Sequence, residues 1–556
     1  MSSTIATAQF HMTGVVDAVA DAIGDRTLVV QGERRFTHRQ MSERSRRLAR
    51  FLHGQGLGMH TDRGDLPGHE AGQDLMGIYA YNGNEYLEGL LGAFRARVAP
   101  FNVNYRYVNT ELTYLLNDSG ATALLYHAAF APRVAEIRGD LPTLRVLIQI
   151  ADGSGNELLD GAVDYESIVT DGAAEGPDVE HSPDDLYVLY TGGTTGAPKG
   201  VLWRQHDIFI AGFGGRQFAD NDPSQPYRQI AENAAAQPEN KMLVLPPLMH
   251  GAAQWASMLS LITGQTLVFP AQVEGLDGDE VAATIERERI PVVAGVGDAM
   301  ARPFLAAMQS GKHDLSALKI WANGGAPLSP AIKQRLIDSH PGLLVADGVG
   351  SSETGMQMQH LSTLGAVSTG IFVPGTGTCV VAEDKTAFVT AGHDGIGWLA
   401  QRGSVPLGYK GDAEKTAAVY PVIEGERCSV SGDRARHLAD GTIELLGRDS
   451  VTINSGGEKI FAEEVEMAIA SHPAVSDVLV VGRPSPTWGQ EVVAVVAVTD
   501  GAAATPEELT AHGATTIARY KLPKAIVFVP TIVRSPAGKP DYRWARLQVS
   551  ASAEGN

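Results

Sequence analysis

A string rich in glycine and threonine is the part of the sequence best suited to chemistry. Residues 190–200 read Tyr-Thr-Gly-Gly-Thr-Thr-Gly-Ala-Pro-Lys-Gly and follow the apolar run 186–189. Glycines let main-chain N–H groups approach a ligand, while the threonine hydroxyls and one lysine add donors and a positive charge. The lysine precedes glycine, not serine or threonine, so this is not a Walker loop. The string predicts a phosphate-binding loop, with these candidate contacts: Thr191, Gly192, Gly193, Thr194, Thr195 and Lys199.

This string resembles the signature loop of the adenylate-forming superfamily, which includes acyl-CoA synthetases, peptide-synthetase adenylation domains and beetle luciferases. Further motifs follow in the family's order and spacing, so the resemblance covers nearly the whole chain. Residues 104–107, 297–303 and 534–542 look closest to actinobacterial acyl-CoA synthetases of fatty-acid and sterol side-chain breakdown. The resemblance implies that ATP activates a carboxylic acid as an acyl-adenylate, and that the acyl group then passes to a thiol, expected to be coenzyme A.

The resemblance also assigns a nucleotide site. Its adenine loop would be Gly324, Gly325 and Ala326, and the adenylate would lie beside Val349, Gly350, Ser351 and Ser352. The family commonly has an aromatic residue that stacks on adenine where this chain has Val349. Asp433 and Arg448 resemble the family's ribose clamp, because a carboxylate accepts hydroxyl protons well and the arginine can donate to oxygen.

Three residues are expected at the reacting centre by the same resemblance. His250 would sit beside the reacting carboxylate, and Glu353 would hold Mg²⁺, which usually takes one or two carboxylates together with phosphates. Lys539 matches the family's catalytic lysine, which would hold carboxylate and α-phosphate oxygens together while charge builds in the transition state. Without such a context, a glycine-flanked lysine is usually a solvated surface cation.

A second glycine loop, Ser455, Gly456 and Gly457, is expected to line the path of the pantetheine arm of coenzyme A. It follows the hinge of the family, which usually carries Asp or Lys two residues after the arginine. This chain has Ser450 at that position, so the pivot is placed by alignment alone.

Apolar runs and helical periodicity predict the elements that position these residues. Short strands at 28–30, 74–79, 123–126, 243–245, 266–269 and 292–294 alternate with helical patterns such as 41–53 and 85–95, which favours an α/β class with much parallel sheet. Residues 217–240 are polar and are expected to run over the surface. We expect a large layered α/β N-terminal domain, 1–448, and a small mobile α+β C-terminal domain, 449–556, with helices at 462–470 and 506–518.

Composition narrows the function classes. The formal charge of −20 argues against a general nucleic-acid binder. Only two cysteines occur, which excludes a disulfide scaffold and favours a reducing cytoplasm. We expect no signal peptide and no transmembrane segment. A homodimer is a family-level expectation.

Three alternatives stay open at this point: an adenylating enzyme that loads a carrier protein, a luciferase-like oxidase, and a non-catalytic adenylate-binding protein. The absence of a carrier-like serine motif after the last domain disfavours a multidomain synthetase. The intact phosphate loop, together with Glu353, Asp433 and Lys539, argues against a protein that only binds adenylate.

Overall fold

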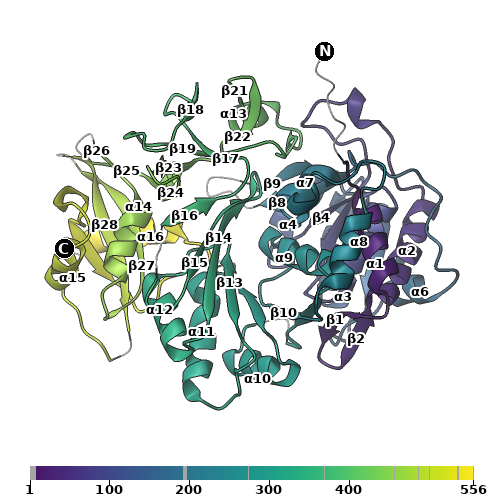
Figure 1. Cartoon of the computed structure of the whole chain (residues 1–556), viewed down its shortest axis with the longest axis horizontal. Helices are drawn as coiled ribbons and strands as arrows, with labels where there is room; N and C mark the ends of the chain where they lie inside the picture. Colours follow the sequence, from purple (N-terminus) through teal and green to yellow (C-terminus); the bar gives the residue numbers. More distant parts are fainter. Residues whose placement is uncertain are drawn as a thin grey trace.

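The computed structural model describes residues 8–191, 197–272, 275–367, 370–455, 458–485, 488–499, 501–534 and 538–554. Within these residues the chain forms three sheets. Two belong to a large layered α/β part and the third to a smaller part at one end of the molecule (Figure 1).

An eight-stranded sheet carries the start of the phosphate loop. Its strands stand in the order β20-β9-β8-β4-β3-β5-β6-β7, parallel from β8 to β7. Strands such as β5 are buried along their whole length, as expected where helices cover both faces of a parallel sheet. The strands are β3 Leu75–Tyr79, β4 Ala99–Asn102, β5 Ala123–His127, β6 Val146–Ile150, β7 Ala162–Asp164, β8 Leu186–Thr191, β9 Lys199–Arg204 and β20 Gly408–Tyr409.

A sixteen-stranded sheet forms the middle of the molecule. The strands from β1 to β14 in the sheet order are parallel, and the edge strand β2 is antiparallel to β1. From β14 to β15 onwards the strands pair antiparallel. The strands are β1 Thr27–Gln31, β2 Arg34–Thr37, β10 Lys241–Val244, β11 Thr266–Phe269, β12 Val292–Gly295, β13 Ile320–Gly324, β14 Leu344–Ser351, β15 Gly355–Ser362, β16 Ile371–Pro374, β17 Thr378–Val381, β18 Phe388–Val389, β19 Gly397–Arg402, β21 Val422–Ile423, β22 Glu426–Ser429, β23 Asp433–His437 and β24 Ile443–Arg448.

Helices cover these sheets and connect their parallel strands. They are α1 Met12–Ile23, α2 His38–Gly54, α3 Asn84–Arg95, α4 Asn109–Ser119, α5 Ala131–Ile137, α6 Tyr165–Thr170, α7 Gln205–Ala211, α8 Arg228–Ala236, α9 Gly251–Ile262, α10 Gly278–Glu288, α11 Gly297–Ser310, α12 Pro330–Ser339 and α13 Ala413–Val419.

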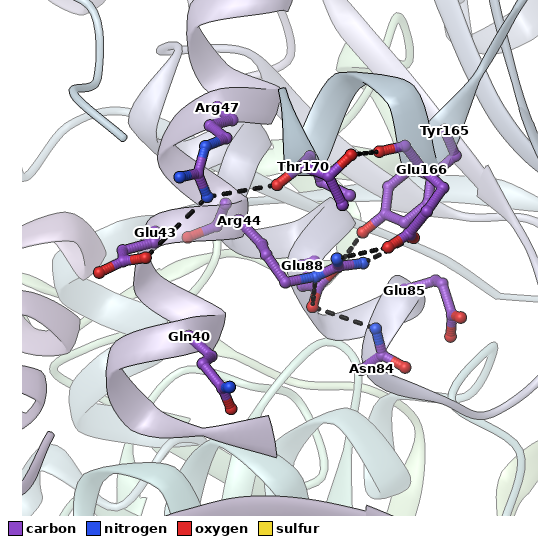
Figure 2. A network of polar contacts seen from close by, with 12 residues as sticks. Gln40, Glu43, Arg44, Arg47, Asn84, Glu85, Glu88, Tyr165, Glu166 and Thr170 are labelled. Atoms are coloured by element: carbon purple, nitrogen blue, oxygen red, sulfur yellow. Dashed lines mark hydrogen bonds and ion pairs between the residues drawn. The ribbon is translucent and has the colours of Figure 1, made fainter. Parts of the chain in front are cut away.

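A buried polar network joins helices α2, α3 and α6 (Figure 2). The guanidinium of Arg44 donates to Glu88 at 2.9 Å and, through two nitrogens, to Glu166 at 2.7 and 2.9 Å. The Tyr165 hydroxyl also donates to Glu88. Burial raises the pKa of Glu88 to about 7 although Arg44 opposes the shift. Because each polar atom here has a partner, the network fixes how the three helices pack.

The polar stretch 217–240 contains a helix that we did not predict. Helix α8 spans Arg228–Ala236 and buries Ile230 and Ala234, which lie four residues apart on one face, against α1. Two buried positions are too few to produce a clear amphipathic pattern in a polar segment. The helix predicted at 506–518 is shorter than expected and ends at Gly513.

The smaller part is a five-stranded sheet packed by three helices. Strand β28 is central, with β27 and β25 antiparallel to it and β29 parallel. The elements are β25 Ile453–Ser455, β26 Glu458–Ile460, α14 Ala462–Ala470, β27 Val475–Ser485, β28 Gly489–Val498, α15 Pro506–Gly513, β29 Ala525–Phe528 and α16 Tyr542–Glu554.

Glu466 on α14 is a carboxyl group enclosed by this sheet and α16. Val480 donates its backbone N–H to Glu466 Oε1 at 2.9 Å, and the Tyr542 hydroxyl donates to Oε2 at 3.4 Å. Burial, followed by the negative charge of Glu463, raises the pKa of Glu466 from 4.5 to about 8, and the charge of Arg534 opposes this.

Replacing Glu466 with glutamine is expected to stabilise the protein at high pH and to change little in acid. The folded state keeps this proton up to about pH 8, whereas the unfolded chain loses it near 4.5. The stabilising contribution is therefore complete below 4.5 and is lost as pH rises through 8, by at most ~1.4 kcal/mol per pH unit. Urea unfolding of both proteins at about pH 5 and about pH 9 measures this. Equal midpoints at the higher pH would contradict the prediction.

None of the helices in the described part of the chain combines the length and the apolar character that a membrane-spanning helix needs.

Candidate functional site

The two ends of the phosphate loop are held together by strand pairing. Strands β8 and β9 are antiparallel neighbours, with Thr191 opposite Lys199. The ammonium of Lys199 lies 3.1 Å from Asp412 at the start of α13. Residues 192–196, which include Gly192, Gly193, Thr194 and Thr195, lie outside the described residues.

His250 stands at the end of the turn 246–250, directly before helix α9. Its Nε2 is buried without a hydrogen-bond partner in the described part of the chain. Burial, followed by the positive charges of Lys539 and Arg106, lowers the pKa of His250 to about 4. At neutral pH the ring is therefore uncharged and has an unused nitrogen for a ligand.

Glu353 lies at the tip of the hairpin formed by β14 and β15. The hairpin closes with Ser351 opposite Gly355, and Trp203 Nε1 donates to the carbonyl of Ser352 at 2.8 Å. The Tyr409 hydroxyl donates to Glu353 Oε1 at 2.8 Å, which orients the carboxylate. On the strand behind it, a bulge separates Val349 from Gly350.

The expected adenine loop follows strand β13. Gly325 has φ +83°, a conformation that favours glycine. The amide of Asn323 donates to the carbonyl of Ala326 at 3.1 Å and accepts the backbone N–H of Gly297 at 2.7 Å. Asn323 thereby joins the ends of β12 and β13.

The expected ribose clamp is formed on neighbouring strands. Asp433 on β23 pairs in register with Arg448 at the end of β24. Arg448 Nε donates to Asp433 Oδ1 at 3.2 Å, and the charge of Asp433 raises the pKa of Arg448. The Ser431 hydroxyl donates to the other carboxylate oxygen at 3.3 Å. These two bonds fix the orientation of the Asp433 carboxylate.

Replacing Asp433 with alanine is expected to weaken ATP binding about 10- to 100-fold, the usual cost of a charged hydrogen bond. Folding should change little because Arg448, the ion-pair partner of this carboxylate, keeps 45% of its side-chain surface exposed and stays solvated when the carboxylate is removed. Calorimetric titration with ATP measures the change, and Asp440→Ala, in the exposed turn of the same hairpin, is the matched control. Unchanged ATP affinity of the Asp433 variant would show that the clamp assignment is wrong.

Lys539 is brought to the large part of the molecule by its glycine neighbour. Gly538 is buried with φ +72°, and a Cβ built on it would lie 3.5 Å from Ala299 Cβ and 3.5 Å from the carbonyl of Val296. The Lys539 side chain keeps solvent contact. Partial removal of the ammonium from water, followed by the positive charge of Arg448, lowers the pKa of Lys539. The negative charge of Glu353 opposes this shift.

Four residues that are far apart in sequence therefore influence one another electrostatically. Lys539 acts on the pKa of His250, and Arg448 and Glu353 act on the pKa of Lys539. Ser455 is described in β25, opposite Gly489, whereas Gly456 and Gly457 lie outside the described residues. Two contributors were not predicted. Tyr409 donates to Glu353, and the charge of Arg106 lowers the pKa of His250. Tyr409 belongs to no motif considered above, and Arg106 lies in the segment 104–107, which was assigned no role at the site.

The residues present fit a Mg²⁺ ion that is held mainly by phosphates. Among the described residues, no three His, Cys, Asp or Glu side chains are grouped as a self-sufficient metal site. Glu353 supplies one carboxylate, which Tyr409 orients through Oε1. One carboxylate with substrate phosphates is a donor set that Mg²⁺ accepts.

Two family models match the chain. One, described as AMP-binding enzyme, matches residues 16–409, and the other, described as AMP-binding enzyme C-terminal domain, matches 464–539. The medium-chain acyl-CoA ligase Mig of Mycobacterium avium is 66% identical over 548 residues, covering 99% of both chains. The 3-oxocholest-4-en-26-oate–CoA ligase of Rhodococcus rhodochrous is 38% identical, covering 97% of this chain and 96% of its own.

Solved structures share the whole fold. The anthranilate CoA ligase AuaEII with anthranoyl-AMP matches with a TM-score of 0.81 at 20% identity and covers 100% of both chains. A fatty acyl CoA synthetase of Mycobacterium tuberculosis matches with a TM-score of 0.70. The predicted fold class, with a large α/β and a smaller C-terminal domain, is confirmed.

The predicted activity, an ATP-dependent acid–thiol ligase, is confirmed at the level of reaction type by the curated relatives. From the two family models and these relatives, the chain belongs to the AMP-binding enzyme family.

Proposed function

We propose that this ligase activates medium-chain or sterol side-chain carboxylic acids as acyl-adenylates and transfers the acyl group to coenzyme A. The observation that carries the proposal is that Lys539, His250 and Glu353, far apart in sequence, are near enough for their charges to interact. Lys539 lowers the pKa of His250, and the charge of Glu353 acts to raise that of Lys539. The names of the relatives support the lipid acid as substrate, since they are ligases for medium-chain acids and for 3-oxocholest-4-en-26-oate.

In the first half-reaction, a carboxylate oxygen of the acid attacks the α-phosphorus of ATP and pyrophosphate leaves. The acid itself is the nucleophile, so the protein positions the reactants and stabilises charge. Lys539 would contact carboxylate and α-phosphate oxygens as negative charge builds. The uncharged ring of His250 would hydrogen-bond to the acid through Nε2 without adding a further cation.

The nucleotide would be held from both sides. Asp433 and Arg448 would bind the ribose, and the loop of Gly324, Gly325 and Ala326 would lie along the adenine. Mg²⁺ would be held by Glu353 and the phosphates, and it supplies neutralisation of phosphate charge. Tyr409 would keep the Glu353 carboxylate aimed at that position.

In the second half-reaction, the thiol of coenzyme A attacks the acyl carbon, and AMP leaves with the electrons of the acyl–oxygen bond. We place the domain boundary at 448/449. The small domain would move between the two steps, because it carries both Lys539 and the loop of Ser455, Gly456 and Gly457. Ser450 lies in this hinge, where a small residue can absorb a dihedral change.

Small side chains beside His250 would leave room for a bulky acyl group. A Cβ built on Gly325 would lie 3.7 Å from Ala252 Cβ, and one built on Gly348 would lie 2.8 Å from the terminal carbon of Met356. Glycine at position 348 leaves room for the end of the Met356 side chain, and a methionine can adapt its shape to different acyl chains.

The test is ATP–pyrophosphate exchange and coenzyme A ligation across short, medium and long fatty acids and a sterol side-chain acid. We expect AMP and pyrophosphate as products, with the highest kcat/KM for medium-chain or sterol side-chain acids. Absence of exchange with every acid would reject the ligase proposal. Efficient exchange with acyl transfer to a carrier protein, but not to coenzyme A, would favour the carrier-loading alternative.

We further propose a cytoplasmic location and a homodimer. Both cysteines, Cys379 and Cys428, are free thiols, which is consistent with a reducing compartment. The homodimer rests on the family resemblance alone, and light scattering of the purified protein tests it.

A further inference from the structure

Side-chain amides hold the turn that carries His250. Asn82, which follows β3, donates to the carbonyl of Pro246 at 2.9 Å and accepts the backbone N–H of Leu248 at 2.6 Å. Asn102, at the end of β4, donates to the carbonyl of Met249 at 2.7 Å. The residue that precedes His250 is therefore fixed to the eight-stranded sheet.

Asn102 differs from Asn82 because it also binds the strand that leads into the phosphate loop. Its amide donates to the carbonyl of Tyr190 at 2.9 Å, and its carbonyl oxygen accepts the backbone N–H of Tyr190 at 2.8 Å. Tyr190 directly precedes Thr191. One side chain with 6% exposure thus satisfies three backbone groups on two segments.

We propose that Asn102 is a positioning residue that sets the spacing between the phosphate loop and His250. It joins Tyr190, one residue before the loop, to Met249, one residue before His250. In the proposed function, these segments hold the two reactants of the first half-reaction, ATP and the carboxylic acid. The inference rests on that proposed function and adds a residue that touches neither reactant.

Asparagine is suited to this task because its amide has two N–H donors and a carbonyl acceptor on one short side chain. Alanine offers none of these groups, and serine offers one hydroxyl. A buried link of this kind matters for rate, since a displacement of ~1 Å between reacting groups can cost about 100-fold.

The experiment compares Asn102→Ala and Asn102→Ser with Asn82→Ala as the matched control. Asn82→Ala removes two bonds to the same turn but leaves the link to Tyr190 in place. For each variant we would measure ATP–pyrophosphate exchange, ATP affinity by calorimetry, thermal unfolding, and acyl transfer from supplied acyl-adenylate to coenzyme A.

We expect kcat for exchange to fall about 30-fold or more in Asn102→Ala and less in Asn102→Ser, consistent with lost alignment of reactants. ATP affinity and acyl transfer from supplied acyl-adenylate should stay within about threefold of wild type, because neither step needs both reactants aligned. In Asn82→Ala, kcat for exchange should fall by less than about threefold, a tenth of the fold-change expected for Asn102→Ala. If Asn102→Ala does not fold, Asn102→Ser carries the comparison.

An exchange kcat within about threefold of wild type in the folded Asn102 variants would overturn the inference. So would an equal loss in Asn82→Ala, or a parallel loss of exchange and acyl transfer, because either would mean a general loosening of the turn. Absence of exchange in the wild-type protein is a different outcome, and it would reject the proposed function instead.

Discussion

Replacing Lys539 with alanine is expected to lower acyl-adenylate formation by about 1,000-fold, in line with the loss of a principal charge-stabilising donor. The reason is electrostatic. Lys539 is positioned among His250, Glu353 and Arg448, and it is the cation that the small domain adds to this neighbourhood. A supplied acyl-adenylate already contains the bond between the acid and phosphorus, so Lys539 is not needed to form it. Transfer of its acyl group to coenzyme A should therefore stay within about fivefold of wild type.

Two assays on one purified sample check this expectation: ATP–pyrophosphate exchange, and thioester formation from synthetic acyl-adenylate. Lys524→Ala is the matched control, because Lys524 is an exposed lysine of the same small domain. Its exchange rate should equal that of wild type. Equal loss of both half-reactions in the Lys539 variant would refute the assignment.

Local motifs were predictable because each is a short string with its own chemistry. The run of glycines and threonines at 190–200 predicted a phosphate loop, and the structure places its described ends on paired strands. Asp433 and Arg448 were expected together, and they form an ion pair at 3.2 Å. Their ligand contacts stay predictions.

Long-range partners were not predictable, because nothing in the local sequence marks them. Asn102 and Tyr190 are 88 residues apart, and Tyr409 and Glu353 are 56 apart. An isolated asparagine or tyrosine occurs everywhere in a globular protein, so its role becomes visible only when strands bring it beside another segment. Helix α8 was missed for a different reason. Its four alanines among nine residues favour a helix, but its two buried positions, Ile230 and Ala234, give too weak an apolar pattern to be recognised.

A disulfide between positions 299 and 538 would test whether the small domain must move during the reaction. A Cβ on Gly538 would lie 3.5 Å from Ala299 Cβ, which is within the range that a disulfide requires. Ala299 is exposed at the start of α11, so a cysteine there disturbs no core. Cysteine at position 538 must adopt φ +72°, a strained but accessible conformation for a single residue.

The double variant Ala299→Cys/Gly538→Cys, once oxidised, is expected to keep acyl-adenylate formation and to lose transfer to coenzyme A. This is the reverse of the effect expected for Lys539→Ala. Once oxidised, the bond holds Lys539 beside His250 and Glu353, so ATP–pyrophosphate exchange should persist. Transfer to coenzyme A should fall by about 100-fold or more, because the proposed second step requires Lys539 to leave and the glycine loop to approach. Acyl-adenylate should accumulate on the enzyme, and a reducing agent should restore transfer.

Two controls keep this result interpretable. Each single cysteine variant, treated with the same oxidant, should retain both half-reactions. The native thiols should not interfere, because burial raises the pKa of Cys379 to about 12 and also raises that of Cys428, which keeps both largely protonated and weakly reactive. If fully cross-linked enzyme still formed acyl-CoA at the wild-type rate, the small domain would not need to move, and both half-reactions would take place in the arrangement seen in the structure.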